Sequence, residues 1–215
     1  MTREELIKKV ALKMDEISSS DDVIVPVGTG YNNPLYTQIN SLLNESVNDA
    51  LMKAPIYRLH GHLGKESTFT PIEVFSKTRK VAQITVPADF IRLASISDQL
   101  FQRPIIELAI EGDDVDKRQH NKHLVAKYAK PVAVMGSGET NRIITCYSYA
   151  SSDTPSPTLL YIKRYDKERD TAAETDLDEY MVDLVSWVCA GRVFAAQGDA
   201  NKGKICDDNA AALMI

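Results

Sequence analysis

Histidines are the first residues in this chain whose spacing suggests chemistry. His60 and His62 flank a glycine, and His120 and His123 stand three positions apart in a charged stretch. A zinc site needs three or four ligands held in tight geometry. No cysteine and no dense acidic cluster lies near either pair in the sequence. We therefore interpret all four as loop histidines, and we expect no metal and no other cofactor.

Ser137 and Cys146 are the two candidate nucleophiles. A serine nucleophile on a strained turn is typically found in GxSxG, whereas this chain has Gly136-Ser137-Gly138. Cys146 lies in an apolar run, where a thiol usually fills a core. Neither residue has a histidine at a recognisable spacing, although catalytic partners can be distant in sequence. We expect no catalysis, and a small hydrolase using one of these residues with a histidine stays open as the alternative.

Two glycine pairs and one acidic series also invite a binding interpretation. Gly28-Thr29-Gly30 and Gly136-Ser137-Gly138 lack the spacing of a phosphate-binding loop, and the second pair fits a hairpin turn between two strands. The acidic series lacks the pattern of a calcium loop and is interleaved with basic residues, which favours a solvated connector and a helix N-terminus. The series comprises Asp166, Glu168, Asp170, Glu174, Asp176, Asp178, Glu179 and Asp183.

Composition limits the class of protein further. The 215 residues are 44% hydrophobic and 26% charged, with a formal net charge of -5, which is typical of a globular protein with a real core. An acidic chain is poorly suited to wrapping nucleic acid through phosphate contacts. Three widely spaced cysteines indicate reduced thiols. The first residues do not resemble a signal peptide, and no apolar run is long enough to span a membrane.

Helical periodicity marks both ends of the chain. Apolar residues recur at helical spacing over residues 2–17, 34–51 and 177–197, and shorter helices are predicted over 70–78 and 205–214. Thr2 with Glu5 and Asp176 with Glu179 have the spacing of a capping box, and Asn33 with Pro34 is a cap followed by a proline in the first turn.

The middle of the chain changes to the alternation of β-strands. We predict about five short strands, one of them over 104–110 and followed by a polar loop or short helix over 111–121, and residues 131–135 and 142–149 form a hairpin. The expected fold class is therefore α+β, in which N-terminal and C-terminal helices form a helical bundle with an inserted antiparallel β unit. The expected domains are residues 1–79 plus 170–215 for the bundle and residues 80–169 for the β unit.

The last residues of the chain are unusually apolar. Termini are commonly polar and frayed, so an apolar terminal segment is expected either to fold onto its own core or to dock into another subunit. The segment consists of Ala211, Ala212, Leu213, Met214 and Ile215.

The stretch Val86-Pro87-Ala88-Asp89-Phe90-Ile91-Arg92-Leu93 resembles a segment at the entry to the β unit of phage head-to-tail connector proteins, also called adaptors or tail tubular protein A. The amphipathic helix at Ile39–Glu45 and the helix at Leu177–Gln197, with Tyr180 and Ala190, lie where that family has its early and late helices. The chain is more similar to connector-like proteins of phages that infect gut Bacteroidetes than to those of the best-studied short-tailed phages.

This resemblance implies a non-catalytic virion protein made in the cytoplasm of the bacterial host. It implies a homo-oligomeric ring, commonly of twelve copies, that sits under the portal protein and contacts other tail or ring proteins, while DNA passes through the lumen without specific binding and no membrane is involved. Another tail ring or a virion accessory protein is the alternative. Residues 55–69 and 111–128 have no counterpart in the family.

Specific contacts follow from the same resemblance. The segment from about Cys206 to Ile215 is expected to reach the portal, with the apolar residues 211–215 as its anchors. Subunit or tail contacts are expected at Phe69, Ile72 and Phe75.

Overall fold

The chain folds into two compact units, each with its own core. A computed structural model describes residues 1–18, 34–121, 123–138, 141–167, 172 and 174–215. One unit comprises Met1–Gly61 and Arg164–Ile215, and the other comprises His62–Lys163. The expected α+β class is confirmed, with N-terminal and C-terminal helices packed together and the strands lying between them in the sequence. Residues 62–79, which we expected to lie with the helices, belong to the strand-bearing unit.

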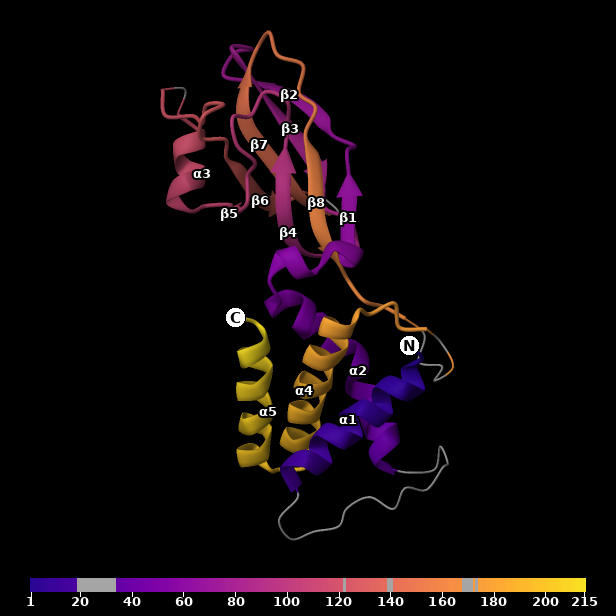
Figure 1. The fold of residues 1–215 in the computed structure, drawn as a ribbon. Helices are drawn as coiled ribbons and strands as arrows, with labels where there is room; N and C mark the ends of the chain where they lie inside the picture. Colours follow the sequence, from indigo (N-terminus) through magenta and orange to yellow (C-terminus); the bar gives the residue numbers. More distant parts are fainter. Residues whose placement is uncertain (19–33, 122, 139–140, 168–171, 173) are drawn as a thin grey trace. The chain divides into compact units, whose positions relative to one another are not determined.

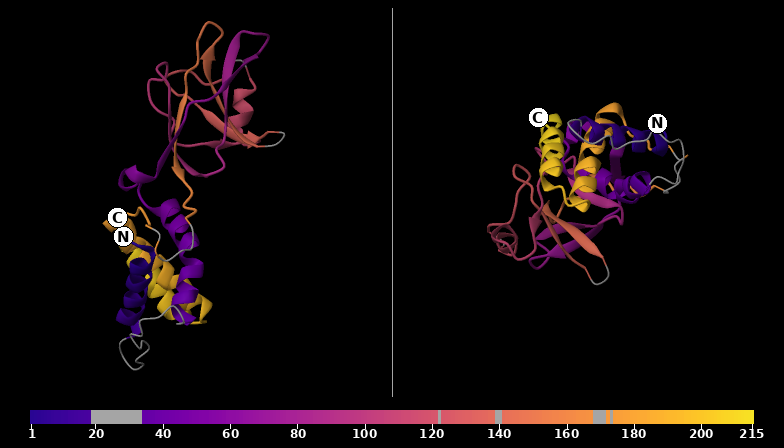
Figure 2. Two further views of the ribbon diagram at one scale, coloured as in Figure 1. Left: turned by 90° about the vertical axis from the view of Figure 1, so that its right-hand side faces the viewer. Right: turned by 90° about the horizontal axis from the view of Figure 1, so that it is seen from below.

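In the described residues of the helical unit, four α-helices pack together, and α4 lies at their centre. Most side chains of α4 are buried, and this helix packs against each of the other three (Figures 1 and 2). In the described part of the chain, no helix is long and apolar enough to cross a membrane. The bounds of the helices are α1 Arg3–Ser18, α2 Pro34–Lys53, α4 Glu179–Ala196 and α5 Ala200–Leu213.

Side-chain caps fix where these helices begin. Thr2 and Glu5 form the predicted capping box, because each backbone N–H donates to the other's side chain, at 2.9 and 3.3 Å. The cap predicted at Asp176 is wrong. Asp178 caps α4 by accepting from Met181 N–H, and Asp176 lies two residues earlier with a φ of +51°. The cap predicted at Asn33 lies outside the described residues.

A row of asparagines on α2 holds the unit together. The buried guanidinium of Arg3 donates to the side-chain oxygens of Asn40 and Asn44 at 2.5 and 2.7 Å. Asn48 both accepts from Tyr165 N–H and donates to Tyr165 C=O, at 2.8 and 3.0 Å. The polar face of α2 therefore binds α1 and the segment that returns from the strand-bearing unit.

The helices α4 and α5 approach each other through two glycines. A Cβ atom added at Gly191 would lie 3.2 Å from Cys206 Cβ and 3.3 Å from Gly203 O. A Cβ atom added at Gly203 would lie 3.3 Å from Gly191 O. The pair lets α5 lie flat on α4, with Cys206 and Ala210 buried between them.

The described residues of the strand-bearing unit form eight strands in two sheets, more than the five predicted. One sheet has the order β1-β8-β4, and the other has the order β2-β3-β7-β6-β5. All neighbouring strands are antiparallel except β5 and β6. The strands are β1 Leu63–Glu66, β2 Thr70–Val74, β3 Arg79–Thr85, β4 Phe90–Ser97, β5 Ala109–Ile110, β6 Ala133–Ser137, β7 Arg142–Ala150 and β8 Thr158–Lys163.

Two predicted elements of this unit are wrong. Residues 70–74 form the edge strand β2 and not a helix, and residues 75–78 are the turn to β3. Most of the strand predicted over 104–110 is absent, because Ile105 pairs with Ile96 of β4 and only Ala109–Ile110 join the other sheet. The segment 104–110 therefore crosses from one sheet to the other. The predicted hairpin of β6 and β7 is confirmed.

The two sheets enclose a shared apolar core. It includes Ile84 of β3, Ile96 of β4, Ile144 of β7 and Leu159 of β8. The helix α3, Asp114–Gln119, follows β5 and begins at the cap Asp113.

Candidate partner-binding surfaces

The segment that follows the buried part of α5 is apolar and faces water. Ala211 and Ala212 are exposed, Met214 is half-buried, and Leu213 is 38% exposed. Ile215 is fully exposed at the margin of the helical unit (Figure 1). Of the two fates expected for this segment, folding onto the core is therefore wrong for most of its side chains.

Part of the expected docking segment is structural. Cys206 and Ala210 are buried against α4, and their neighbours Asp207 and Asp208 are exposed. Removing the chain from Cys206 onward would uncover α4 and would not test docking alone. Residues 211–215 are the apolar part of this segment that a partner can reach without disturbing the helical core.

The three residues expected at subunit or tail contacts differ in how accessible they are. Phe69 packs against the core of the strand-bearing unit. Phe75 is half-buried in the turn after β2, where it has a φ of +52°. Ile72 is exposed on β2 and is the most accessible of the three.

The segment that carries the resemblance to connectors has a structural role in the described fold. Phe90 N–H donates to Pro87 C=O at 3.1 Å, which turns the chain into β4. The Tyr161 hydroxyl donates to Asp89 Oδ1 at 2.9 Å, and the Phe90 and Tyr161 rings stack with centroids 5.7 Å apart. The motif therefore fixes the entry to β4 against β8.

The candidate nucleophiles do not have the surroundings of catalytic groups. Cys146 is buried, and this burial, with a smaller contribution from Asp98, raises the pKa of its thiol to about 12. A thiol is nucleophilic as the thiolate, so this cysteine is unreactive at neutral pH. Ser137 is exposed at the end of β6, and its backbone N–H donates to Glu111.

The four histidines weighed as metal ligands lie in two separate segments of the chain. His60 and His62 are in a short 3₁₀ helix, and His120 lies 3.3 Å from the carboxylate of Asp116. Among the residues that the structure describes, no three histidine, cysteine or acidic side chains are grouped as a metal site would require. Gly28-Thr29-Gly30, Glu168 and Asp170 lie outside those residues.

One surface was not predicted from the sequence. Ile106 and Ile110 are 66% and 70% exposed, and Val115 of α3 is also exposed. They lie in a segment that we expected to be a strand over 104–110 followed by a polar loop or short helix over 111–121, and α3 is that short helix. The available signal was the run Pro-Ile-Ile-Glu-Leu-Ala-Ile at 104–110, which has more apolar residues than one buried strand face can use.

Comparison with known proteins adds no further assignment. No protein-family model matches the sequence, and no curated protein matches it at a significant level.

Proposed function

We propose that this chain is a structural ring subunit of a tailed-phage neck, which connects the head portal to the tail and performs no catalysis. The proposal assigns it to the virion, after synthesis in the host cytoplasm. Its partners are the portal protein, other tail or ring proteins and further copies of itself. Twelve copies in the ring would follow from the resemblance to connectors.

The observation that carries the proposal is the exposed apolar segment 211–215. Ile215 is fully exposed to water and Leu213 partly so, which is unfavourable, and fully burying an exposed side chain such as that of Ile215 contributes about 1.5–3 kcal/mol. A partner that covers the segment gains that free energy without disturbing the packing of α5 on α4. The portal-facing role that the resemblance assigns to this part of the chain fits such a surface.

A ring requires that each copy present two different surfaces to its neighbours. The exposed Ile72 on β2 is our proposed contact to the next subunit or to the tail, with Phe75 in the adjoining turn. Phe69 directly precedes this strand and is partly buried against the core of the unit, so it would support the contact made by Ile72. The net charge of -5 suits a lumen through which DNA passes without binding.

Co-sedimentation with the portal ring encoded in the same genome tests the proposal. We expect stoichiometric binding of the full chain and loss of binding by the double variant Leu213→Asp, Ile215→Asp. The control is Ile205→Asp, because Ile205 is 48% exposed on the same helix but lies before the docking segment.

Each other outcome has a definite meaning. If the full chain fails to bind the portal yet occurs in purified virions, the protein belongs to another ring or accessory position in the tail. If the protein is absent from virions, the neck assignment is wrong. Equal binding by the double variant and the wild type would remove residues 211–215 from the interface.

A further inference from the structure

A groove opens in the strand-bearing unit where two segments diverge. Ala109 and Ile110 of β5 pair with Val134 and Met135 of β6. Earlier in the chain, Ile105 turns away to pair with Ile96 of the other sheet. The gap between residues 103–109 and residues 131–133 forms an open cavity of about 500 Å³, to which Asp113 and Val115 also contribute.

The floor of this groove is apolar. Ile105 and Ala133 are buried at its base, and Leu108 and Val132 are half-buried. Ile106 leaves most of its side chain in water at the rim. Exposed apolar surface concentrated around a hollow is typical of a binding site.

The groove also presents free backbone groups. In the described part of the chain, the N–H and C=O groups of residues 106–108 form no hydrogen bond with other residues. By contrast, Ile110 N–H donates to the side chain of Asp113, and Ile110 C=O accepts from Asp113 N–H. Residues 106–108 therefore form an unpaired stretch of backbone that leads into the edge strand β5, and an extended chain can satisfy such groups by adding a strand.

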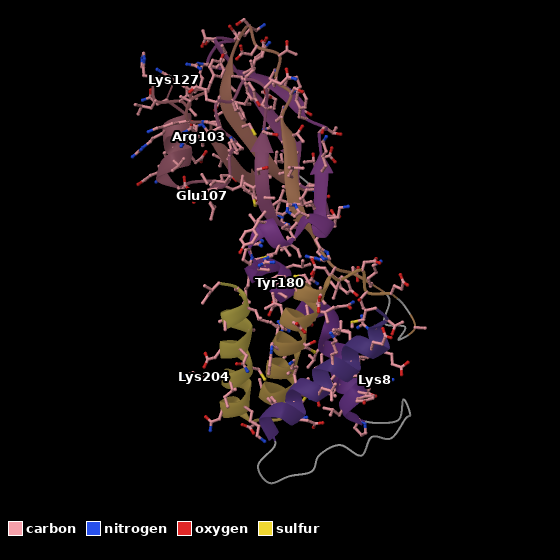
Figure 3. All side chains as sticks on the ribbon, viewed as in Figure 1. Lys8, Arg103, Glu107, Lys127, Tyr180 and Lys204 are labelled. Carbon is pink, nitrogen blue, oxygen red and sulfur yellow. The ribbon has the colours of Figure 1, made fainter. Side chains whose placement is uncertain are left out.

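The charges around the groove are separated. Arg103 lies at one end, and Lys127 and Lys130 are close to it, because Gln102 N–H donates to Tyr128 C=O in the turn between the two lysines. Glu107 lies further along, and Lys127, Arg103 and Glu107 follow one another along the side of the unit that carries α3 (Figure 3). None of these four side chains forms an ion pair with another described residue.

We propose that this groove binds an extended segment of a partner protein by strand addition along residues 106–108. The segment has apolar side chains at alternate positions, which enter the groove. It carries an acidic residue at the Arg103 end and a basic residue at the Glu107 end. The interaction does not depend on the phage-neck assignment.

The charge pattern and the need for a strand distinguish this occupant from the exposed apolar segment of another copy. The exposed apolar segment of the chain itself, residues 211–215, continues a helix and contains no basic residue. A strand that pairs with residues 106–108 needs free N–H and C=O groups of its own, which a helix lacks.

Binding of designed peptides to the full chain tests the proposal. The probes are two fluorescently labelled peptides, acetyl-Asp-Val-Thr-Val-Thr-Val-Lys-amide and acetyl-Lys-Val-Thr-Val-Thr-Val-Asp-amide, followed by fluorescence anisotropy. We expect saturable binding of one peptide in preference to the other, because parallel and antiparallel addition differ in their hydrogen-bond pattern and place the two terminal charges at opposite ends of the groove. Replacing the central valine by proline removes its N–H and should abolish binding.

Two variants make the result specific to the groove. Ile106→Asp should weaken binding at least tenfold, whereas Leu124→Asp, which changes a residue of the same unit that is 59% exposed and does not line the groove, should not. The double variant Arg103→Glu, Glu107→Lys should reverse the preference between the two peptides, because it exchanges the charges at the ends.

Several results would overturn the proposal. These are no saturable binding of either peptide, equal loss of binding in Ile106→Asp and Leu124→Asp, and an unchanged preference in the charge-exchanged variant. Sedimentation velocity then measures whether the chain associates with itself through the groove. Self-association of the wild type that is lost in Ile106→Asp would assign the groove to a second copy of the chain.

Discussion

At the scale of single residues, the contact between Asp89 and Tyr161 explains a motif that the sequence could only match to a family. The stretch around Pro87 was recognisable by its order of residues, but its partner on β8 lies 72 positions later than Asp89. No local pattern predicts such a contact. The structure accounts for each of the three motif residues Pro87, Asp89 and Phe90 through the turn, the hydrogen bond and the ring stacking.

This contact predicts a dependence on alkaline pH. Burial, followed by the hydrogen bond to Asp89, raises the pKa of Tyr161 to about 12, above the value of about 10 for a tyrosine in an unfolded chain. The folded state therefore favours the neutral phenol. This contribution to the free energy of unfolding is complete below pH 10 and falls as the pH rises toward 12.

Tyr161→Phe isolates that contribution. The variant loses the hydrogen bond, which costs about 1–2 kcal/mol at neutral pH, but it has no phenol to ionise. We expect the difference in unfolding free energy between wild type and variant, measured by urea denaturation, to be smaller at pH 11 than at pH 9. A difference that is the same at both values would show that Tyr161 ionises normally in the folded protein.

At the scale of elements, local signals predicted helices better than strands. The apolar stripes of α1, α2 and α4 are continuous in sequence, so their existence followed from helical spacing alone. Thr70-Pro71-Ile72-Glu73 has the residue types of a helix start, yet it forms β2. Proline is tolerated there because β2 is an edge strand, and its pairing with β3 is a contact that helix-start signals do not report.

The close approach of α4 and α5 gives a prediction at this scale. In a helix, replacing glycine by alanine contributes about 0.5–1 kcal/mol of stability if there is room. At Gly191 the new methyl group would meet Cys206 Cβ at 3.2 Å, Asp207 Oδ1 at 3.2 Å and Gly203 O at 3.3 Å. Overpacking costs about 1–3 kcal/mol, so we expect Gly191→Ala to be destabilising by about 1 kcal/mol in urea denaturation.

Gly203→Ala is the matched control for the same contact. The new methyl group would have one close neighbour, Gly191 O at 3.3 Å, and the next atom, Ala195 N, is 3.8 Å away. The gain in helix propensity should nearly offset this single contact, so the variant should lie close to the wild type. If Gly191→Ala proved more stable than the wild type, the two helices would be less closely packed than described.

At the scale of the whole molecule, the sequence predicted an inserted β unit but not its limits. The predicted return of the chain to the helical unit, at residue 170, lies close to the observed return at Arg164, because the β pattern ends there. The entry point was placed too late, since β1 at Leu63–Glu66 has little alternation and pairs with β8, nearly 100 positions away. Gly64 in this strand accommodates the Tyr161 ring, and a contact of that kind is invisible in a local pattern.

The division into two units predicts that the helical unit folds without the inserted one. Its core is formed by residues of α1, α2 and α4, among them Leu6, Leu43 and Leu184, which are fully buried. The chain leaves this unit after Gly61 and returns at Arg164. We therefore expect a chain in which residues 62–163 are replaced by a short glycine-serine linker to show helical circular dichroism and a cooperative thermal transition.

A control variant and a binding assay test this prediction. Adding Val188→Asp to the shortened chain places a charge where α4 is buried, and it should abolish the cooperative transition, because an unpaired buried charge is strongly unfavourable. The shortened chain keeps residues 211–215 on an intact α5, so it should still sediment with the portal if that segment is the anchor. If the shortened chain folds but does not bind the portal, the proposed portal contact would move to the strand-bearing unit. If the shortened chain does not fold, the helical core depends on the inserted unit.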